Sequence, residues 1–295
     1  MVEQSHRSGA AANASPLFLV LGAALLWSTG GLFIKWTTLN AFELTFGRSL
    51  LAALTVAFFT RREGFRMNMM TILTSLLYAA LLILFVIATK LTTAANAIFL
   101  QYTAPIYVLV LEPLFYKEKF RRADLFAVAA CIAGMSLFFV GKLRPQDVSG
   151  NLTALASGLC FAFYILLLRH PHTQKVNRAS SVIYGNLLLV IITAPAGLAA
   201  LEHISLRDAG SVLYLGVIQI GVAYTLFTLG MSRGVRSLDA AIVGYIEPVL
   251  NPIWVFLFLG ERPSTWAIIG GAIIIAAVAS HTIWGTGKAT VKAGE

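Results

Sequence analysis

Apolar residues occupy this 295-residue chain in long blocks separated by short polar segments. Ten blocks carry few enough charges to cross a bilayer as helices, because about 20 apolar residues span its hydrocarbon core. The connections between them are too short to hold a soluble catalytic domain. The pattern therefore predicts an all-α membrane protein of ten transmembrane helices, at residues 17–36, 42–60, 69–89, 94–116, 122–141, 151–168, 180–200, 209–231, 237–259 and 264–284.

A stretch in the first half of the chain recurs in the second half. Residues 97–120 align without a gap on residues 240–263, at an offset of 143 positions and with six identities. Each half contains five spans, and an odd number makes the second half enter the membrane from the opposite side. Two inverted five-helix repeats are therefore expected, as in many secondary transporters. The shared positions include Tyr102 with Tyr245, Pro105 with Pro248, and Glu118 with Glu261.

These repeats divide the chain into four predicted parts. Residues 1–16 are expected to be a disordered cytoplasmic N-terminus, and residues 286–295 a cytoplasmic tail. Residues 17–145 form the first repeat and residues 146–285 the second. Basic residues gather in the predicted loops on the side of both termini, which hold 15 of the 22 lysines and arginines. The positive-inside rule then places both termini in the cytoplasm.

Composition agrees with a membrane protein and argues against a soluble domain, a nucleic-acid-binding protein and an enzyme. The chain is 58% hydrophobic and 12% charged, against about 45–50% and about 25% in soluble domains. The net charge of +9 reflects the loop asymmetry and does not call for a nucleic-acid partner. Cys131 and Cys160 lie inside spans, and no pattern of a metal site, cofactor site or catalytic triad is present. No enzymatic activity, metal or cofactor is expected.

Polar and aromatic residues at the centres of six spans predict a substrate site. In inverted-repeat carriers the site lies near the bilayer midplane between the repeats. Polar side chains at that depth usually face the bundle interior. We expect a cavity between the first, third, fourth, sixth, eighth and ninth spans, although any single aromatic residue could serve packing alone. The candidate lining residues are Trp27, Ser28, Tyr78, Gln101, Tyr102, Phe163, Tyr164, Gln219, Tyr224, Tyr245 and Glu247.

Glu247 is the most informative of these residues. It lies about ten residues into the ninth span, where a carboxylate is costly and by default points to function. It could receive an amino group of a substrate or bind a proton. It could instead form an internal hydrogen bond that shapes the helix beside Pro248.

Other charged residues in or near the spans are expected to be structural. Arg48 lies about seven residues into the second span and is expected to pair with Glu43 or to reach outward along the helix. Glu112 is expected to reach the headgroup zone. Lys35 and Arg169, at the ends of the first spans of the two halves, resemble interface anchors.

Prolines and glycines suggest where the helices bend. Pro105 and Pro248 occupy matching positions and each removes one backbone hydrogen bond from the middle of a span. We expect these sites to act as hinges that open the two halves in turn; a fixed curvature is the alternative. The remaining hinge candidates are Gly30, Gly31, Gly216, Gly221 and Pro252.

Two motifs also carry a family resemblance. The IEPV of residues 246–249 and the FLGE of residues 258–261, within a 5+5 pattern of short spans, resemble EamA-type members of the drug/metabolite transporter superfamily. The resemblance covers the chain after residue 16 and is closest to bacterial exporters of aromatic amino acids. One departure is that the second half has no arginine matching Arg48.

The resemblance implies an inner-membrane carrier that works by alternating access. Its expected cargo is amino acids, aromatic and other small ones, and related metabolites moving outward from the cytoplasm. Its partners would be this small-molecule substrate and membrane lipids, with the chain as a monomer or homodimer. The alternatives are an efflux carrier for organic cations or other drugs and metabolites, which an aromatic cavity with a carboxylate would also suit, and a channel.

Overall fold

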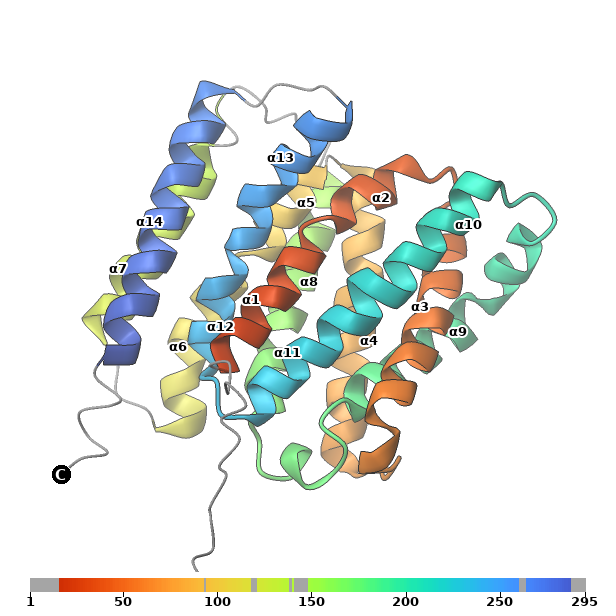
Figure 1. The fold of residues 1–295 in the computed structure, drawn as a ribbon, viewed down its shortest axis with the longest axis horizontal. Coiled ribbons are helices and arrows are strands. Elements are labelled where there is room, and N and C mark those ends of the chain that lie inside the picture. The colour runs from red at the N-terminus through yellow and green to blue at the C-terminus, as the bar shows by residue number, and fades with distance from the viewer. Residues whose placement is uncertain are drawn as a thin grey trace, which may run out of the picture.

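The computed structural model describes residues 16–92, 94–117, 121–137, 140, 148–259 and 264–287. All regular structure in these residues is helical (Figure 1). The first half contains α1 (Pro16–Trp27), α2 (Gly30–Trp36), α3 (Ala41–Thr60), η1 (Arg61–Glu63), α4 (Met69–Leu91), α5 (Ala94–Gln101), α6 (Ala104–Tyr116) and α7 (Arg122–Leu137). The second half contains α8 (Val148–Leu168), η3 (Thr173–Lys175), α9 (Ser180–Ala200), α10 (Leu206–Leu213), η4 (Tyr214–Val222), α11 (Ala223–Ser232), α12 (Ser237–Gly244), α13 (Ile246–Leu259) and α14 (Thr265–Gly287).

These helices confirm the predicted all-α membrane fold. Within the described ranges, nine helical segments are long and apolar enough to cross a membrane. The remaining predicted span, the fifth, corresponds to α7, of which 16 residues are described. Helix α7 packs against α14, and the pair lies at one edge of the bundle, opposite α3 and α9 (Figure 1).

Helix packing repeats itself between the two halves. From the first half, α3 packs against η4 and α1 packs against α11 of the second half. From the second half, α9 and α8 both pack against α4 of the first half. Exchanging the first five spans for the last five converts each of these pairs into another observed pair. A twofold relation between the halves produces this pattern, as the inverted repeat predicts.

Three of the spans are interrupted near their middle. The first breaks at Ser28 and Thr29, the fourth at Tyr102 and Thr103, and the ninth at Tyr245. The fourth and ninth spans break at aligned positions of the repeat, because Tyr102 and Tyr245 are 143 residues apart. Irregular backbone at membrane depth is tolerated where protein surrounds it, and these residues are buried except Thr29 and Thr103, which are half-buried.

The matching prolines follow these breaks directly. Pro105 is the second residue of α6 and Pro248 the third residue of α13. A proline in the first helical turn removes an N–H that has no partner within its helix. The two prolines therefore start new half-helices, whereas the sequence suggested bends within continuous ones. Pro252 lies within α13.

Some predicted features fall at or beyond the limits of the described residues. Glu118 and Glu261 of the repeat lie outside them, as does the predicted boundary between the repeats near residue 145. The same is true of residues 1–15 and 288–295 of the predicted tails. The helical ends differ slightly from the prediction, since α1 already includes Pro16 and α14 extends to Gly287.

Candidate functional site

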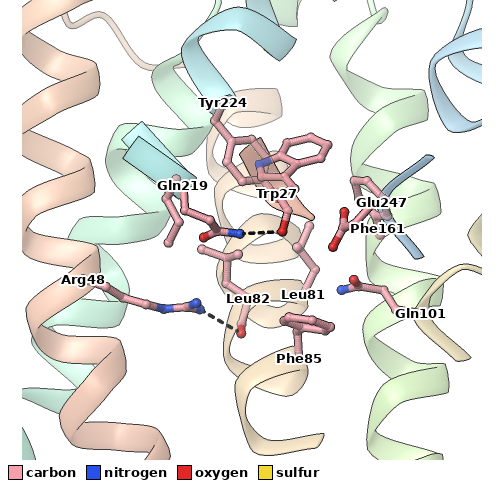
Figure 2. A pocket seen from close by; sticks show the side chains of 11 residues that line it. Trp27, Arg48, Leu81, Leu82, Phe85, Gln101, Phe161, Gln219, Tyr224 and Glu247 are labelled. Carbon is pink, nitrogen blue, oxygen red and sulfur yellow. Dashed lines mark hydrogen bonds between the residues drawn. The ribbon is translucent and has the colours of Figure 1, made fainter. Parts of the chain in front are cut away.

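A small cavity lies inside the bundle, among the broken spans. Its volume is about 30 Å³, room for one or two water molecules and far below the ~300–1,000 Å³ of typical ligand pockets. A small-molecule substrate would have to widen it. Figure 2 shows the lining residues, which are Trp27, Arg48, Leu81, Leu82, Phe85, Gln101, Phe161, Gln219, Ile220, Tyr224 and Glu247.

Glu247 places a carboxylate at the wall of this cavity. It is the second residue of α13, where the partial positive charge of a helix N-terminus favours an anion. The Oη of Tyr102 donates a hydrogen bond of 2.6 Å to Oε2 of Glu247. Both residues are buried, and Gly244 makes room for the Tyr102 ring. A single hydrogen bond thus connects the two equivalent breaks of the repeats.

Two glutamines supply the neutral polar groups of the wall. Gln101 Nε2 donates to Ser157 Oγ at 2.7 Å, and Ser157 Oγ donates to the Leu81 carbonyl at 2.7 Å. Gln219, in the π-helical segment η4, donates from Nε2 to the Trp27 carbonyl at 3.5 Å. Its Oε1 is buried and has no hydrogen-bond partner among the described residues. The cavity therefore offers both amide donors and an amide acceptor.

Aromatic rings form another part of the wall. The Trp27 ring lies 4.7 Å from Tyr224, 5.1 Å from Phe227 and 6.2 Å from Phe161, measured between centroids. Such edge and tilted contacts are the favoured arrangements of aromatic pairs. The Trp27 Nε1 is buried without a hydrogen-bond partner among the described residues. Trp27 and Tyr224 were predicted at this wall.

Several other predicted lining residues support the wall from behind. Tyr78 contacts Tyr224 at 4.9 Å and Tyr164 at 5.4 Å, and its hydroxyl accepts a 3.0 Å hydrogen bond from Asn186. Neither Tyr78 nor Tyr164 lines the cavity. Tyr245 is buried against the Tyr102 ring at 5.7 Å and does not line the cavity either. These residues form a second layer that positions the first.

Ser28 and Phe163 also differ from the prediction. Ser28 Oγ accepts from Trp254 Nε1 at 2.8 Å, and its carbonyl accepts from Asn251 Nδ2 at 3.1 Å. Ser28 therefore fastens the break in the first span to α13. The predicted residue Phe163 is only partly buried, and Phe161 lines the cavity in its place. Two residues correspond to about 200° around a helix, so the two rings point in nearly opposite directions.

The candidate hinge glycines lie where helices approach closely. A Cβ at Gly30 would lie 2.6 Å from Gln219 Nε2. A Cβ at Gly216 would lie 2.6 Å from Leu51 Cβ, and one at Gly221 would lie 2.6 Å from Thr55 Cγ2. Close packing against β-carbon and backbone atoms is reason enough for glycine at Gly216 and Gly221, whereas the neighbour of Gly30 is the end of the flexible Gln219 side chain. Gly31 is buried in the first turn of α2. A hinge role for these residues remains a prediction.

Arg48 is a functional candidate that the sequence argument assigned to structure. Its side chain reaches the cavity from α3 and is buried, with 1% exposure (Figure 2). Nη2 donates to the Leu82 carbonyl at 3.3 Å. The expected pair with Glu43 is wrong, because the Glu43 carboxylate accepts from Asn40 N at 2.8 Å and caps α3. Distance along the span indicated the depth of Arg48 but not its direction.

A buried ionic network joins the repeats at the α6–α12 end of the bundle. Glu112 is fully buried and accepts from Arg169 Nη1 and Arg236 Nε, each at 2.9 Å. Arg236 Nη2 lies 2.8 Å from Asp124 Oδ2, and His281 Nε2 lies 2.9 Å from Asp124 Oδ1. The expectation that Glu112 reaches the headgroups is therefore wrong, and Arg169, expected as an interface anchor, pairs with this buried carboxylate. Burial lowers the pKa of Arg236, but the Asp124 hydrogen bond and Glu112 outweigh it and raise that pKa.

A second polar network joins the repeats at the opposite end. The Asp208 carboxylate at the start of α10 accepts from Thr37 Oγ1 at 2.7 Å and from Thr38 N at 2.7 Å. Nearby, Lys35 Nζ donates to the Thr92 carbonyl at 2.8 Å. Each end of the bundle thus carries polar contacts that would have to separate if the repeats moved apart there.

Comparisons with known proteins agree with this architecture. The model of the EamA-like transporter family matches twice, over residues 14–140 and 148–282. The uncharacterized transporter YwfM of Bacillus subtilis is 29% identical over 88% of this chain and 92% of its own. The pseudopaline exporter CntI of Pseudomonas aeruginosa is 25% identical over 89% of this chain and 94% of its own.

A solved crystal structure shares the fold. It superimposes with a TM-score of 0.75 at 21% identity and covers 92% of this chain and 98% of the solved one. The two family matches coincide with the two five-helix halves, and the relatives are transporters and not enzymes. Together with the apolar helices, these matches describe a multi-pass membrane transporter. The chain belongs to the EamA-like transporter family.

Proposed function

We propose that this transporter exports amino acids, aromatic and other small ones, and related metabolites by alternating access. The observation that supports this cargo is the Glu247 carboxylate at a cavity walled by Trp27, Phe161 and Tyr224. A buried carboxylate suits an ammonium group, and the rings suit an apolar or aromatic side chain. A relative named as a pseudopaline exporter supports the outward direction.

The alternating-access mechanism is supported by the arrangement around the cavity. The cavity holds one or two waters, so a loaded site requires the bundle to open. Polar networks around Glu112 and Asp208 join the repeats at opposite ends. Breaking one network while the other persists would expose the cavity to one side at a time. The broken spans provide short segments that can move separately.

We place the protein in the inner membrane with both termini in the cytoplasm. This orientation follows from the distribution of lysine and arginine among the loops. It puts the Glu112–Arg236 network on the cytoplasmic side, because the loops that precede α7 and α12 belong to that side. The carrier acts as a monomer or homodimer on its substrate and contacts membrane lipids.

A carrier for organic cations is the second candidate. The same carboxylate and rings would bind an amine-bearing drug through ion pairing and cation–π contacts. A channel would need the cavity to open to both ends at once.

Counterflow into liposomes that contain the purified protein tests these functions. Labelled phenylalanine and alanine are the first probes, with unlabelled amino acid inside. Saturable uptake that the internal amino acid stimulates would support the proposal. Exchange of an organic cation alone would favour the drug carrier, and unsaturable leak would favour a channel.

Glu247→Gln is the matching variant. It removes the carboxylate and keeps the shape of the side chain, so phenylalanine exchange should fall by about 10-fold or more if the ammonium binds there. Glu202→Gln changes an exposed loop carboxylate and should leave exchange unchanged. Equal exchange by both variants would show that Glu247 does not bind the substrate.

A further inference from the structure

We infer that Arg48 binds the carboxylate of the substrate, so that the carrier requires a cargo with both an ammonium and a free carboxylate. This inference rests on the proposed function and makes it more specific. It selects α-amino acids over amines and organic cations. It also assigns a second charged binding residue on the side of the cavity opposite Glu247.

The hydrogen bonding of Arg48 is incomplete. A guanidinium has five N–H donors, and the structure shows one bond to the described residues, the 3.3 Å contact from Nη2 to the Leu82 carbonyl. That distance is at the long end for a hydrogen bond. Nε is buried and has no partner in the described part of the chain. Donors on a 1% exposed side chain are therefore available to a ligand in the cavity.

Other arginines near the ends of the spans are paired with carboxylates. Arg169 and Arg236 both contact Glu112 at 2.9 Å. Arg48, by contrast, makes no ion pair with any carboxylate that the structure describes, although it is the more deeply buried. An uncompensated charge at membrane depth is expensive and usually marks a substrate or ion pathway. A carboxylate would satisfy a guanidinium with two parallel hydrogen bonds.

The backbone at Arg48 is held firmly in place. A Cβ at Gly216 would lie 2.7 Å from the Arg48 carbonyl oxygen, so α3 and the π-helical segment η4 are in close contact at this point. The contact fixes the origin of the side chain. The guanidinium then extends into the cavity toward Leu82 (Figure 2).

The opposite wall completes a site for a zwitterion. Figure 2 shows Arg48 and Gln219 entering from one side and Glu247 and Gln101 from the other. An α-amino acid would place its carboxylate at Arg48 and its ammonium at Glu247, with its side chain toward Trp27. All charges would then be paired. An amine without a carboxylate would leave Arg48 unpaired and add a second positive charge to the cavity.

The first test compares two substrates in the unaltered protein. Phenylalanine and phenylalaninamide share the ammonium and the ring, but the amide lacks the carboxylate charge. We expect kcat/KM for counterflow to be about 10–100-fold lower for the amide, the range that one charge-assisted hydrogen-bonded pair supplies. Equal exchange of the two compounds would overturn the inference while leaving amino-acid export intact. Exchange of amines with no exchange of amino acids would overturn both proposals.

The second test asks whether the preference for phenylalanine over phenylalaninamide depends on Arg48. Arg48→Gln should bring the phenylalanine-to-amide ratio close to one, and Arg48→Lys should keep part of it because the charge remains. A purely structural arginine would lower the exchange of both compounds equally and leave the ratio unchanged, which would overturn the inference. Arg62→Gln, at an exposed position beyond the end of the same helix, is the matched control. If the Arg48 variants do not fold, the substrate comparison alone decides.

Discussion

Helix α8 approaches the interrupted fourth span so closely at Gly158 that one added methyl group should disturb the candidate site. A Cβ at Gly158 would lie 2.6 Å from the Gln101 carbonyl oxygen, 3.1 Å from Gln101 Cα and 3.1 Å from the Leu100 carbonyl oxygen. All three neighbours are backbone atoms, which cannot rotate away as a flexible side chain can. Ordinary contacts begin near 3.4 Å, so the break must shift by about 0.8 Å (3.4 minus 2.6).

The expected cost follows from this overlap. Overpacking a close-packed interior costs about 1–3 kcal/mol, and alanine returns up to about 1 kcal/mol through its higher helix propensity. Because the contact is with backbone, we expect the upper part of the range and a net loss of about 1–2 kcal/mol in the free energy of unfolding. The shift should also distort the 2.7 Å hydrogen bond from Gln101 to Ser157. Because Gln101 lines the cavity, the candidate site would change with it.

Unfolding of the purified protein in detergent, followed by tryptophan fluorescence, measures this cost. Gly22→Ala is the matched control, because its Cβ would meet Leu226 Cδ1 at an ordinary 3.5 Å. Gly22→Ala should be neutral or slightly stabilising, and Gly158→Ala should be less stable and slower in counterflow. A Gly158→Ala protein as stable as Gly22→Ala would show that the break yields freely, and the reasoning from close packing would fail.

Two further predictions concern hydrogen bonds and ion pairs between the repeats. Tyr102→Phe removes the donor to a buried carboxylate, so the free energy of unfolding should fall by about 1–3 kcal/mol. Tyr107 is half-buried, and its hydroxyl bonds to no carboxylate in the described part of the chain, so Tyr107→Phe should change that free energy by less than about 0.5 kcal/mol. Arg236→Gln removes the cation that Glu112 and Asp124 share. Because Arg169 and His281 still contact these carboxylates, we expect a cost of about 3 kcal/mol, the lower end for breaking a buried ion pair. Arg233→Gln, at an exposed position, should be nearly neutral. Chemical unfolding followed by circular dichroism measures the free energy of unfolding of each variant and its control. Equal values for a variant and its control would contradict the corresponding prediction.

The membrane fold was predictable because one physical requirement dominates it. Backbone groups in lipid must bond within their own segment, so an apolar block of the right length can only be a spanning helix. The matching prolines Pro105 and Pro248 likewise predicted that the same place in both halves departs from a regular helix, and the structure places a break just before each. The position of the prolines relative to the breaks was predicted less well. A proline signals that a helix is interrupted without showing on which side the new helix begins.

The candidate site was predictable in depth but not in direction. Counting residues along a span locates its middle, which identified Trp27, Gln101 and Glu247 at the cavity. The angle around the helix depends on which neighbours it packs against, and uniformly apolar spans carry no periodicity to show this. That is why Phe161 lines the cavity where Phe163 was expected.

The ionic network was out of reach for a different reason. Glu112 meets Arg169 and Arg236 across separations of 57 and 124 residues. No local sequence pattern indicates that residues so far apart in the chain form a pair. Each residue alone resembles an ordinary charge at the membrane interface. The one available signal was Glu112 itself, since a carboxylate four residues before the end of a span needs a partner.

The charged residues of the cavity break the symmetry of the scaffold that holds them. The repeat offset of 143 sets Ala104 opposite Glu247, and α9, the second-half counterpart of α3, contains no charged residue to match Arg48. A symmetric pair of half-helices therefore surrounds a site with one anion and one cation, each supplied by a different repeat. A zwitterion can satisfy such a site in one orientation only. If the repeats open in turn, as proposed, the substrate keeps the same two partners throughout, because Arg48 and Glu247 lie between both gates. The symmetric part of the chain would then govern motion, and the asymmetric part would govern which cargo is carried.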